Sequence, residues 1–321
     1  MTVASRVIAA WQNPPPPLVG GGWGEGCVQP LISVVRTPPP SPLPRGEGED
    51  SATVARYGDR GVGRDRRRFR AAIAAIAGVA LLAAPGWGAK RVVSLNLCSD
   101  QMLVLLAPEQ VAALSPLARD PTLSFVATRA TALPVVRGSA EAVLRLHPDL
   151  VLAGGFGAQT TVALLAQEGV PVWRLDLPQD FAAIRAQTTR LAERLGVPER
   201  GAVLIAAMDA TLRLVRPPAH RITAIAWEPR GYTAGPGSLM DAVLRAAGLA
   251  NAADGSRMGL EALLRHPPDL LVVPLSPGYP SLATDLLDSP AVAAIPRRAL
   301  PPPLTICAGP FTAQAVAMLA R

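Results

Sequence analysis

The residues of this chain that could catalyse a reaction or hold a metal are few and widely spaced. Its three cysteines, Cys27, Cys98 and Cys307, form no C-x-x-C pair, and its three histidines are distant from one another in the sequence. A zinc site needs three or four ligands of these types close together, so neither a metal cage nor a thioredoxin-type motif is predicted. The sequence contains no G-x-S-x-G or H-E-x-x-H motif, and we predict that the protein is not an enzyme and carries no cofactor.

Polar and aromatic side chains instead follow several predicted strands, at the point where each strand ends. In open α/β sheets, ligands bind beyond the carboxyl ends of the strands. Aromatic rings in such positions can stack on a flat ligand, and arginines can neutralise an anionic one. The candidate ligand-binding residues are Asn96, Ser99, Arg119, Phe156, Trp227, Arg230 and Tyr232.

Cys98 and Cys307 also follow predicted strands. In an oxidising compartment they could form a disulfide that ties the first half of the chain to its C-terminal segment. Two buried free thiols explain the sequence equally well, because a sequence does not supply the Cα separation that a disulfide requires.

Short aliphatic runs alternate with helical segments from residue 90 onward. The strands are expected at 91–95, 110–114, 149–153, 170–175, 222–227 and 269–273, and the helices at 99–106, 139–146, 160–168, 181–195, 238–247, 260–264 and 311–320. Such alternation predicts a parallel α/β fold. One further helix is expected at 199–216, where Pro217 and Pro218 end it, and it would be roughly 27 Å long.

An internal repeat organises these elements. Glu141–Leu152 reads EAVLRLHPDLVL and Glu261–Val272 reads EALLRHPPDLLV, and the two align without a gap. Each copy is a short helix, a proline break and a buried strand. We therefore predict two Rossmann-like α/β lobes joined by the single long helix, with a ligand cleft between the lobes.

The first 89 residues have a different composition. Residues 1–61 are rich in proline and glycine, and we expect a disordered or wrongly started N-terminal extension. Residues 62–89 combine a basic run, RDRRRFR, with an apolar run of about 14 residues and a small-residue end, the layout of a secretory signal peptide. The expected lobes then cover 90–178 and 217–321, with linking helices in 179–216.

Composition argues against one further class of partner. Half of the residues are apolar and the net charge is +7, but from Lys90 onward the basic residues are spread along the chain. A nucleic-acid interface needs a local basic stripe, so no nucleic-acid partner is predicted.

Four segments in order resemble the iron-siderophore and vitamin B12 periplasmic-binding domain family: 91–114, 139–154, 234–253 and 259–273. The resemblance implies a monomeric periplasmic substrate-binding protein of an ABC importer. It would capture a ferric siderophore or cobalamin with little hinge closure and deliver it to a permease dimer with its ATPase. Haem, through Tyr232 or Tyr279, and a metal ion are the alternatives within the same transporter class. An exported α/β enzyme is a more distant alternative.

The resemblance also implies that a glutamate on each lobe docks onto arginines of the permease, and Glu141 and Glu261 match those positions. Carboxylate–guanidinium pairs are directional, which suits docking. Stabilisation of the helix dipole explains the same two residues, because both are expected in a first helical turn. The two roles are compatible.

Overall fold

The computed structural model describes residues 88–275 and 289–320, all of which fall in one compact unit of the chain. The expected extension over 1–61, almost all of the expected signal peptide and Tyr279 lie outside the described residues. Within the described ranges, no helix is both long and apolar enough to cross a membrane.

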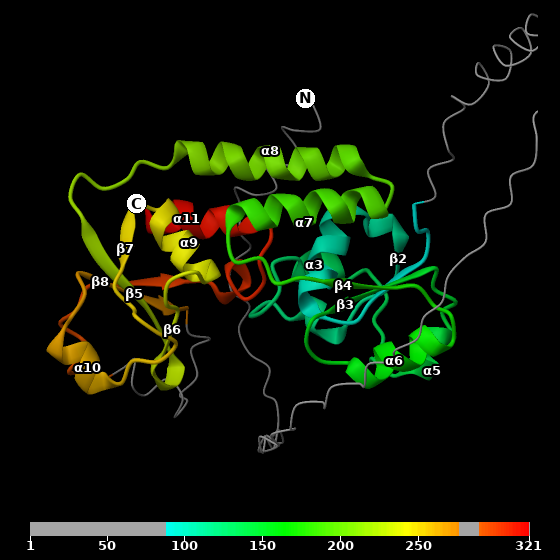
Figure 1. Cartoon of the computed structure of the whole chain (residues 1–321), viewed down its shortest axis with the longest axis horizontal. Helices are drawn as coiled ribbons and strands as arrows, with labels where there is room; N and C mark the ends of the chain where they lie inside the picture. The colour runs from blue at the N-terminus through cyan, green and yellow to red at the C-terminus, as the bar shows by residue number, and fades with distance from the viewer. Residues whose placement is uncertain (1–87, 276–288, 321) are drawn as a thin grey trace, which may run out of the picture. The chain divides into compact units, whose positions relative to one another are not determined.

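The first lobe is built on a parallel sheet with the strand order β2-β1-β3-β4 (Figure 1). Strands β1 and β3 are buried along their whole length, as expected for aliphatic runs in the middle of a parallel sheet. The strands are β1 (Val92–Ser94), β2 (Val111–Ala113), β3 (Leu150–Gly154) and β4 (Val172–Leu175), and the helices are α3 (Leu97–Leu106), α4 (Ala127–Ala130), α5 (Ala140–Leu144) and α6 (Gln159–Gln167).

The second lobe has a five-stranded sheet with the order β6-β5-β8-β9, and β7 also pairs with β5. Strand β6 is antiparallel to β5, whereas the other pairings are parallel. The strands are β5 (Ile222–Glu228), β6 (Tyr232–Thr233), β7 (Leu249–Asn251), β8 (Leu270–Pro274) and β9 (Arg297–Leu300), and the helices are α9 (Leu239–Ala246), α10 (Leu260–Arg265) and α11 (Ala313–Leu319).

Three of these strands, β6, β7 and β9, are missing from the sequence expectation. Strands β6 and β7 have only two and three residues, too few to show an alternating pattern. Strand β9 begins with two arginines and reads RRAL, which does not look like a buried strand. All of the other strands and the long helices lie within about three residues of their expected bounds, which is ordinary scatter for helix and strand ends.

Two packed helices, α7 (Phe181–Arg194) and α8 (Pro198–Leu214), connect the lobes (Figure 1). Helix α8 is the expected long helix. It begins at Pro198, whose missing N–H is no loss at a first helical position. A side chain at Gly201 would have its Cβ 2.5 Å from the Cβ of Ala192 on α7, so a glycine there lets the two helices approach closely.

The linking helices are attached to both lobes. On the first lobe, Arg200 Nη1 donates to Leu106 O at 2.9 Å and pairs with Glu109 at 2.6 Å, while Gln110 Nε2 donates to Leu195 O at 2.9 Å. On the second lobe, Ile184 and Met208 are part of its buried core. Because each end of the helix pair is anchored, α7 and α8 act as a stiff connection.

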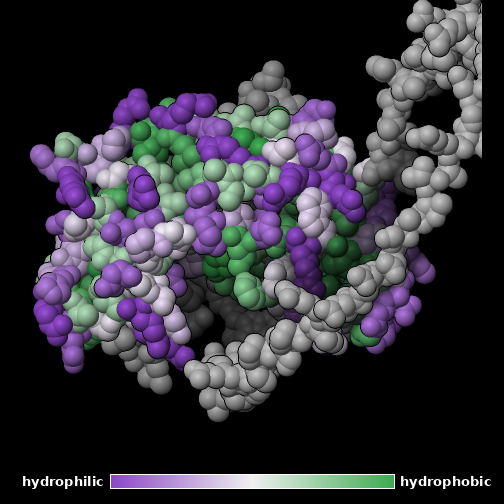
Figure 2. Space-filling view, viewed as in Figure 1, coloured by the Kyte–Doolittle hydropathy of each residue, from purple (hydrophilic) through white to green (hydrophobic). Residues whose placement is uncertain are grey.

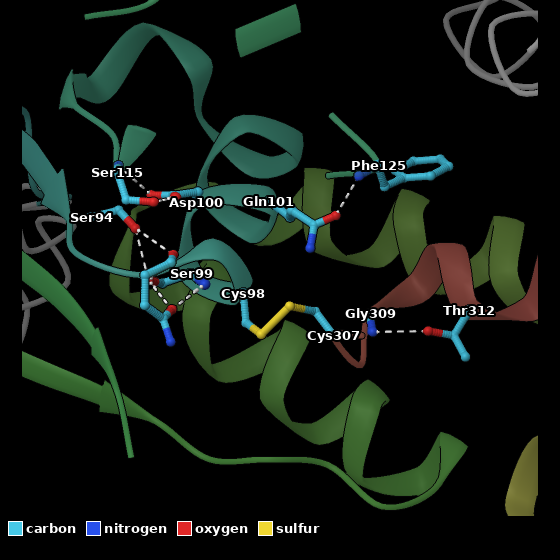
Figure 3. The surroundings of a disulfide bond; sticks show 11 residues. Ser94, Cys98, Ser99, Asp100, Gln101, Ser115, Phe125, Cys307, Gly309 and Thr312 are labelled. Carbon is cyan, nitrogen blue, oxygen red and sulfur yellow. Dashed lines mark hydrogen bonds between the residues drawn. A yellow bond between two sulfur atoms is a disulfide. The ribbon is translucent and has the colours of Figure 1, made fainter. Parts of the chain in front are cut away.

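A second connection joins the lobes through side chains (Figure 3). Cys98 on α3 and Cys307, which precedes α11, form a disulfide with a Cα–Cα distance of 5.2 Å. Of the two alternatives left open by the sequence, the structure therefore has the bonded one. Beside it, the ring of Phe125 stacks on that of Phe311 with centroids 4.7 Å apart. The lobes are thus held at two separate places.

Candidate functional site

Asn96 and Phe156 lie where expected, just after the carboxyl ends of β1 and β3. Phe156 is 77% exposed, so its ring is free to contact a ligand. Asn96 is half-buried and caps α3: its Oδ1 accepts hydrogen bonds from Ser99 N at 2.9 Å and from Ser99 Oγ at 2.7 Å. The first lobe therefore presents an aromatic ring and an amide at neighbouring strand ends.

Ser99 does not face the ligand side, which corrects the sequence expectation. Its side chain is 0% exposed, and its hydroxyl lies 2.7 Å from that of Ser94 as well as from Asn96 Oδ1 (Figure 3). As the third residue of a helix packed on the sheet, it turns inward. Its role is to hold Asn96.

A buried carboxyl group lies next to this network. Asp100 is 0% exposed and accepts from Ser115 N at 3.1 Å and from Ser115 Oγ at 2.5 Å. Desolvation by burial raises the pKa of Asp100 to about 7, although hydrogen bonds from Ser115 and Ser94 act in the opposite direction. Asp100 falls in the helix expected at 99–106, but its burial depends on packing that the sequence alone does not show.

Arg119 is also corrected. Its guanidinium group donates to Ala130 O at 3.2 Å and to Leu133 O at 2.6 Å, both in or just after α4. These bonds close the loop between β2 and α5. The guanidinium is therefore engaged in the fold, and we no longer count Arg119 as a ligand-binding residue.

Trp227 belongs to the core and not to a ligand surface. It is 0% exposed, and its Nε1 donates to Met258 O at 2.9 Å. Strand β5 is buried on both faces at this point, so a residue at the end of the strand points into the protein. The hydrogen bond nevertheless matters for the site, because it holds the 255–258 segment against β5 and β6.

That segment places Arg257 over the ring of Tyr232, with the guanidinium carbon 4.6 Å from the ring centroid. Tyr232 is 48% exposed and follows β5, as expected. Arg257 is absent from the residues expected from the sequence, because its position depends on an isolated β-bridge to Tyr232 that no local sequence pattern predicts. An arginine over a tyrosine face is a cation–π contact.

Arg230 precedes Tyr232 by two residues in the sequence and is exposed. Its backbone adopts φ 63° and ψ 19°, a left-handed conformation that costs energy for a residue with a side chain. Burial raises the pKa of Glu228, the last residue of β5. The second lobe therefore offers a phenol, two guanidinium groups and a carboxyl group at its strand ends.

Within residues 88–275 and 289–320, no three His, Cys, Asp or Glu side chains lie close enough together to hold a metal ion. Two surface pockets have volumes of about 540 and 360 Å³, and neither is lined by any of the expected ligand-binding residues. On the face drawn in Figure 2, hydrophilic and hydrophobic residues are interspersed over the described part of the surface.

The repeated residues Glu141 and Glu261 are both exposed in the first turns of α5 and α10. Neither forms an ion pair with another described residue. The repeated aspartates behave differently: Asp149 accepts from Lys90 N at 2.7 Å, and Asp269 accepts from Thr223 N at 2.7 Å. In each lobe the aspartate fixes the start of the first strand, whereas the glutamate points to solvent.

A family model described as periplasmic binding protein matches residues 92–297. Among solved structures, the periplasmic heme-binding protein RhuT from Roseiflexus sp. RS-1 aligns with a TM-score of 0.58 and 24% identity, covering 73% of this chain and 98% of its own. A periplasmic heme binding protein from Pseudomonas aeruginosa aligns with a TM-score of 0.59 and 23% identity, covering 72% and 91%.

An ABC-type Fe3+-hydroxamate transport system protein from Saccharomonospora viridis DSM 43017 aligns with a TM-score of 0.56 and 20% identity, covering 72% of this chain and 92% of its own. No curated protein sequence matches the chain. At these identities the solved structures establish the two-lobed α/β fold.

Proposed function

Because this chain belongs to the periplasmic binding protein family and serves an ABC importer as its solute-binding protein, we propose that the solute it captures is haem. The observation that carries the proposal is Tyr232, an exposed phenol at the carboxyl end of β5 with Arg257 over one ring face. Tyrosine oxygen is an established axial ligand of haem iron. Arginines beside it can pair with the haem carboxylates.

The first lobe supports the same ligand. Phe156 is exposed after β3 and offers an aromatic face for a flat macrocycle. The similar structures from Roseiflexus and Pseudomonas aeruginosa are both named heme-binding proteins, which also favours haem as the solute.

A ferric siderophore is the second candidate. Arg230 and Arg257 suit an anionic ferric chelate, and the Saccharomonospora viridis structure is named for Fe3+-hydroxamate transport. Cobalamin, also expected from the family resemblance, has no residue in the described site that favours it over these two.

The test is a titration of the purified protein with haemin, followed by the Soret band. We expect saturable binding, and we expect Tyr232→Phe to weaken it roughly ten-fold or more, about 1.4 kcal/mol, and to change the visible spectrum. Tyr279→Phe is the control, because Tyr279 is the other tyrosine considered. Loss of binding in Tyr279→Phe alone would move the iron ligand to that residue.

If the wild-type protein does not bind haemin, the proposal that haem is the solute is wrong. Quenching of tryptophan fluorescence by ferric siderophores or cyanocobalamin in the same protein would then identify the solute, with Trp173 as a partly exposed reporter.

We also propose that Glu141 and Glu261 dock the protein onto the permease. Both carboxylates are exposed and without an ion-pair partner among the described residues, while the other repeated acid in each lobe is engaged in the fold. One free carboxylate per lobe would give a two-fold permease two directional contacts.

Export through a signal peptide in residues 62–89 is proposed on sequence grounds alone. N-terminal sequencing of the protein from the periplasm should find a mature start within about three residues of Ala89. A start that retains the arginine run would contradict this.

A further inference from the structure

The side chain of Asn96 has one engaged end and one free end. Its Oδ1 accepts from Ser99 N and Ser99 Oγ, as described above, and a backbone N–H can only donate. The oxygen is therefore the end that faces α3. The Nδ2 end must point the opposite way, towards the carboxyl edge of the sheet.

Asn96 Nδ2 has no hydrogen-bond partner among the described residues. The comparison with Asn251 in the second lobe shows what an engaged amide looks like: its Nδ2 donates to Ala234 O at 2.9 Å and to Asp241 Oδ1 at 3.1 Å. Asn96 is half-buried as a residue, and both N–H groups of its Nδ2 are unused by the described residues. A donor that is held in one orientation and has no partner in the fold can bond an acceptor that arrives with the ligand.

Gly154, the last residue of β3, provides the room for this amide. A Cβ at Gly154 would lie 2.1 Å from Asn96 Nδ2, far inside contact distance. The φ angle of Gly154 is not positive, so the backbone conformation at this position does not require glycine. The missing side chain therefore serves to leave the amide in place across the ends of β1 and β3.

We propose that Asn96 Nδ2 is a pre-oriented donor that selects ligands presenting an acceptor oxygen at the end of β1, and that Ser99 and Gly154 are its positioning residues. This inference rests on the proposed function, and for haem the acceptor is a propionate carboxylate. It explains why the first lobe, which has lost Arg119 as a ligand residue, can still recognise an anionic group.

Gly154→Ala is the first test, with Gly155→Ala as its matched control. A Cβ at Gly155 meets nothing within 4 Å, and neither glycine has a positive φ. We expect Gly154→Ala to displace the amide and to weaken haemin binding about ten-fold to a hundred-fold, the effect of losing one hydrogen bond to a charged acceptor. Gly155→Ala should bind as wild type does.

Haemin dimethyl ester separates recognition of the carboxylate from general disturbance of the site. Wild type should prefer haemin to the ester, and Gly154→Ala should lose that preference while its unfolding temperature stays close to that of Gly155→Ala. Equal affinity of both glycine variants for haemin would overturn the inference.

Asn96→Asp is the second test, because aspartate keeps the capping oxygen and replaces the free donor by an acceptor. It should bind haemin at least as weakly as Gly154→Ala does, and binding equal to wild type would again overturn the inference. Failure of the proposed function shows up differently, as wild type that does not bind haemin. The same variants are then compared on the ferric siderophore or corrinoid that wild type does bind, with the same two outcomes.

Discussion

The two lobes share a repeated aspartate that anchors the first strand, and they differ in the residues at the opposite ends of their strands. In both, a short helix is followed by a proline and then an aspartate that accepts hydrogen bonds at the start of the first strand. Asp149 accepts from Lys90 N and Arg91 N, and Asp269 accepts from Thr223 N and Thr223 Oγ1. The sequence repeat therefore has a structural cause. Each lobe needs its central strand pair held in register at the amino end.

The strand ends on the opposite edge are not alike. The first lobe has a buried polar network around Asp100, with Asn96 at its surface, whereas the second has the exposed Tyr232 beside Arg257. Residues that repeat thus belong to the scaffold or, as proposed for Glu141 and Glu261, to a two-fold partner. The residues that do not repeat include the proposed ligand contacts, so the proposed ligand would contact the two lobes differently.

Removing the disulfide should have the largest effect on stability. The experiment also tests whether the two lobes unfold as one unit. The bond spans 209 residues, so Cys98→Ala combined with Cys307→Ala should lower the free energy of unfolding by about 5 kcal/mol in the chain-entropy model. Thermal unfolding without reductant measures it. Dithiothreitol should lower the unfolding temperature of wild type and leave the double variant unchanged. Equal unfolding temperatures for wild type and variant would mean that α7 and α8 alone hold the lobes together.

The buried carboxyl of the first lobe should give that lobe its own pH dependence. The folded pKa of Asp100, about 7, lies above its ordinary value of 3.8, so between these values the folded state binds a proton that the unfolded state has lost. Stability should therefore rise as the pH falls from 7 to 5, by about 2 kcal/mol. Asp100→Asn should remove this rise in a series of unfolding temperatures. A rise that persists in Asp100→Asn would assign it to another group.

Substitution of the two repeated glutamates should have the smallest effect on stability and, if the proposed docking role holds, a measurable effect on transport. Glu141→Ala and Glu261→Ala should each cost the fold no more than about 1 kcal/mol, the size of a helix-dipole term, and leave solute affinity unchanged. Uptake by cells carrying the importer should fall for each variant and fall further for both together.

Asp149→Ala and Asp269→Ala are the matched controls for the glutamates, since they alter the same repeat at residues engaged in the fold. They should lower the unfolding temperature. Glutamate variants that lose solute binding, or that transport normally, would refute the docking role.

The order of helices and strands could be predicted because it depends on local features. The short aliphatic run at 149–153, set between a proline and two glycines, favours a buried strand, and Pro217 and Pro218 favour an end to the helix before them. The strands that escaped prediction, β6, β7 and β9, are short or charged and form only because a neighbouring strand offers its edge.

The site was predicted less well, because position after a strand does not fix the direction of a side chain. Asn96, Phe156, Arg230 and Tyr232 remain candidates. Ser99 and Trp227 are buried, and Arg119 is exposed but its guanidinium group is bonded to the backbone of its own loop. Arg257 was missed because it comes from a loop 25 residues beyond Tyr232 in the sequence.

By itself the sequence determined the two-lobed α/β fold, the long linking helix and the repeat, since these follow from periodicity and backbone restrictions within short windows. Tertiary structure alone decided the Cys98–Cys307 bond, the burial of Asp100, the inward turn of Trp227 and the free end of Asn96. The physical reason is distance along the chain. Disulfide formation, desolvation and hydrogen-bond partnership depend on atoms that only the packed lobes bring together.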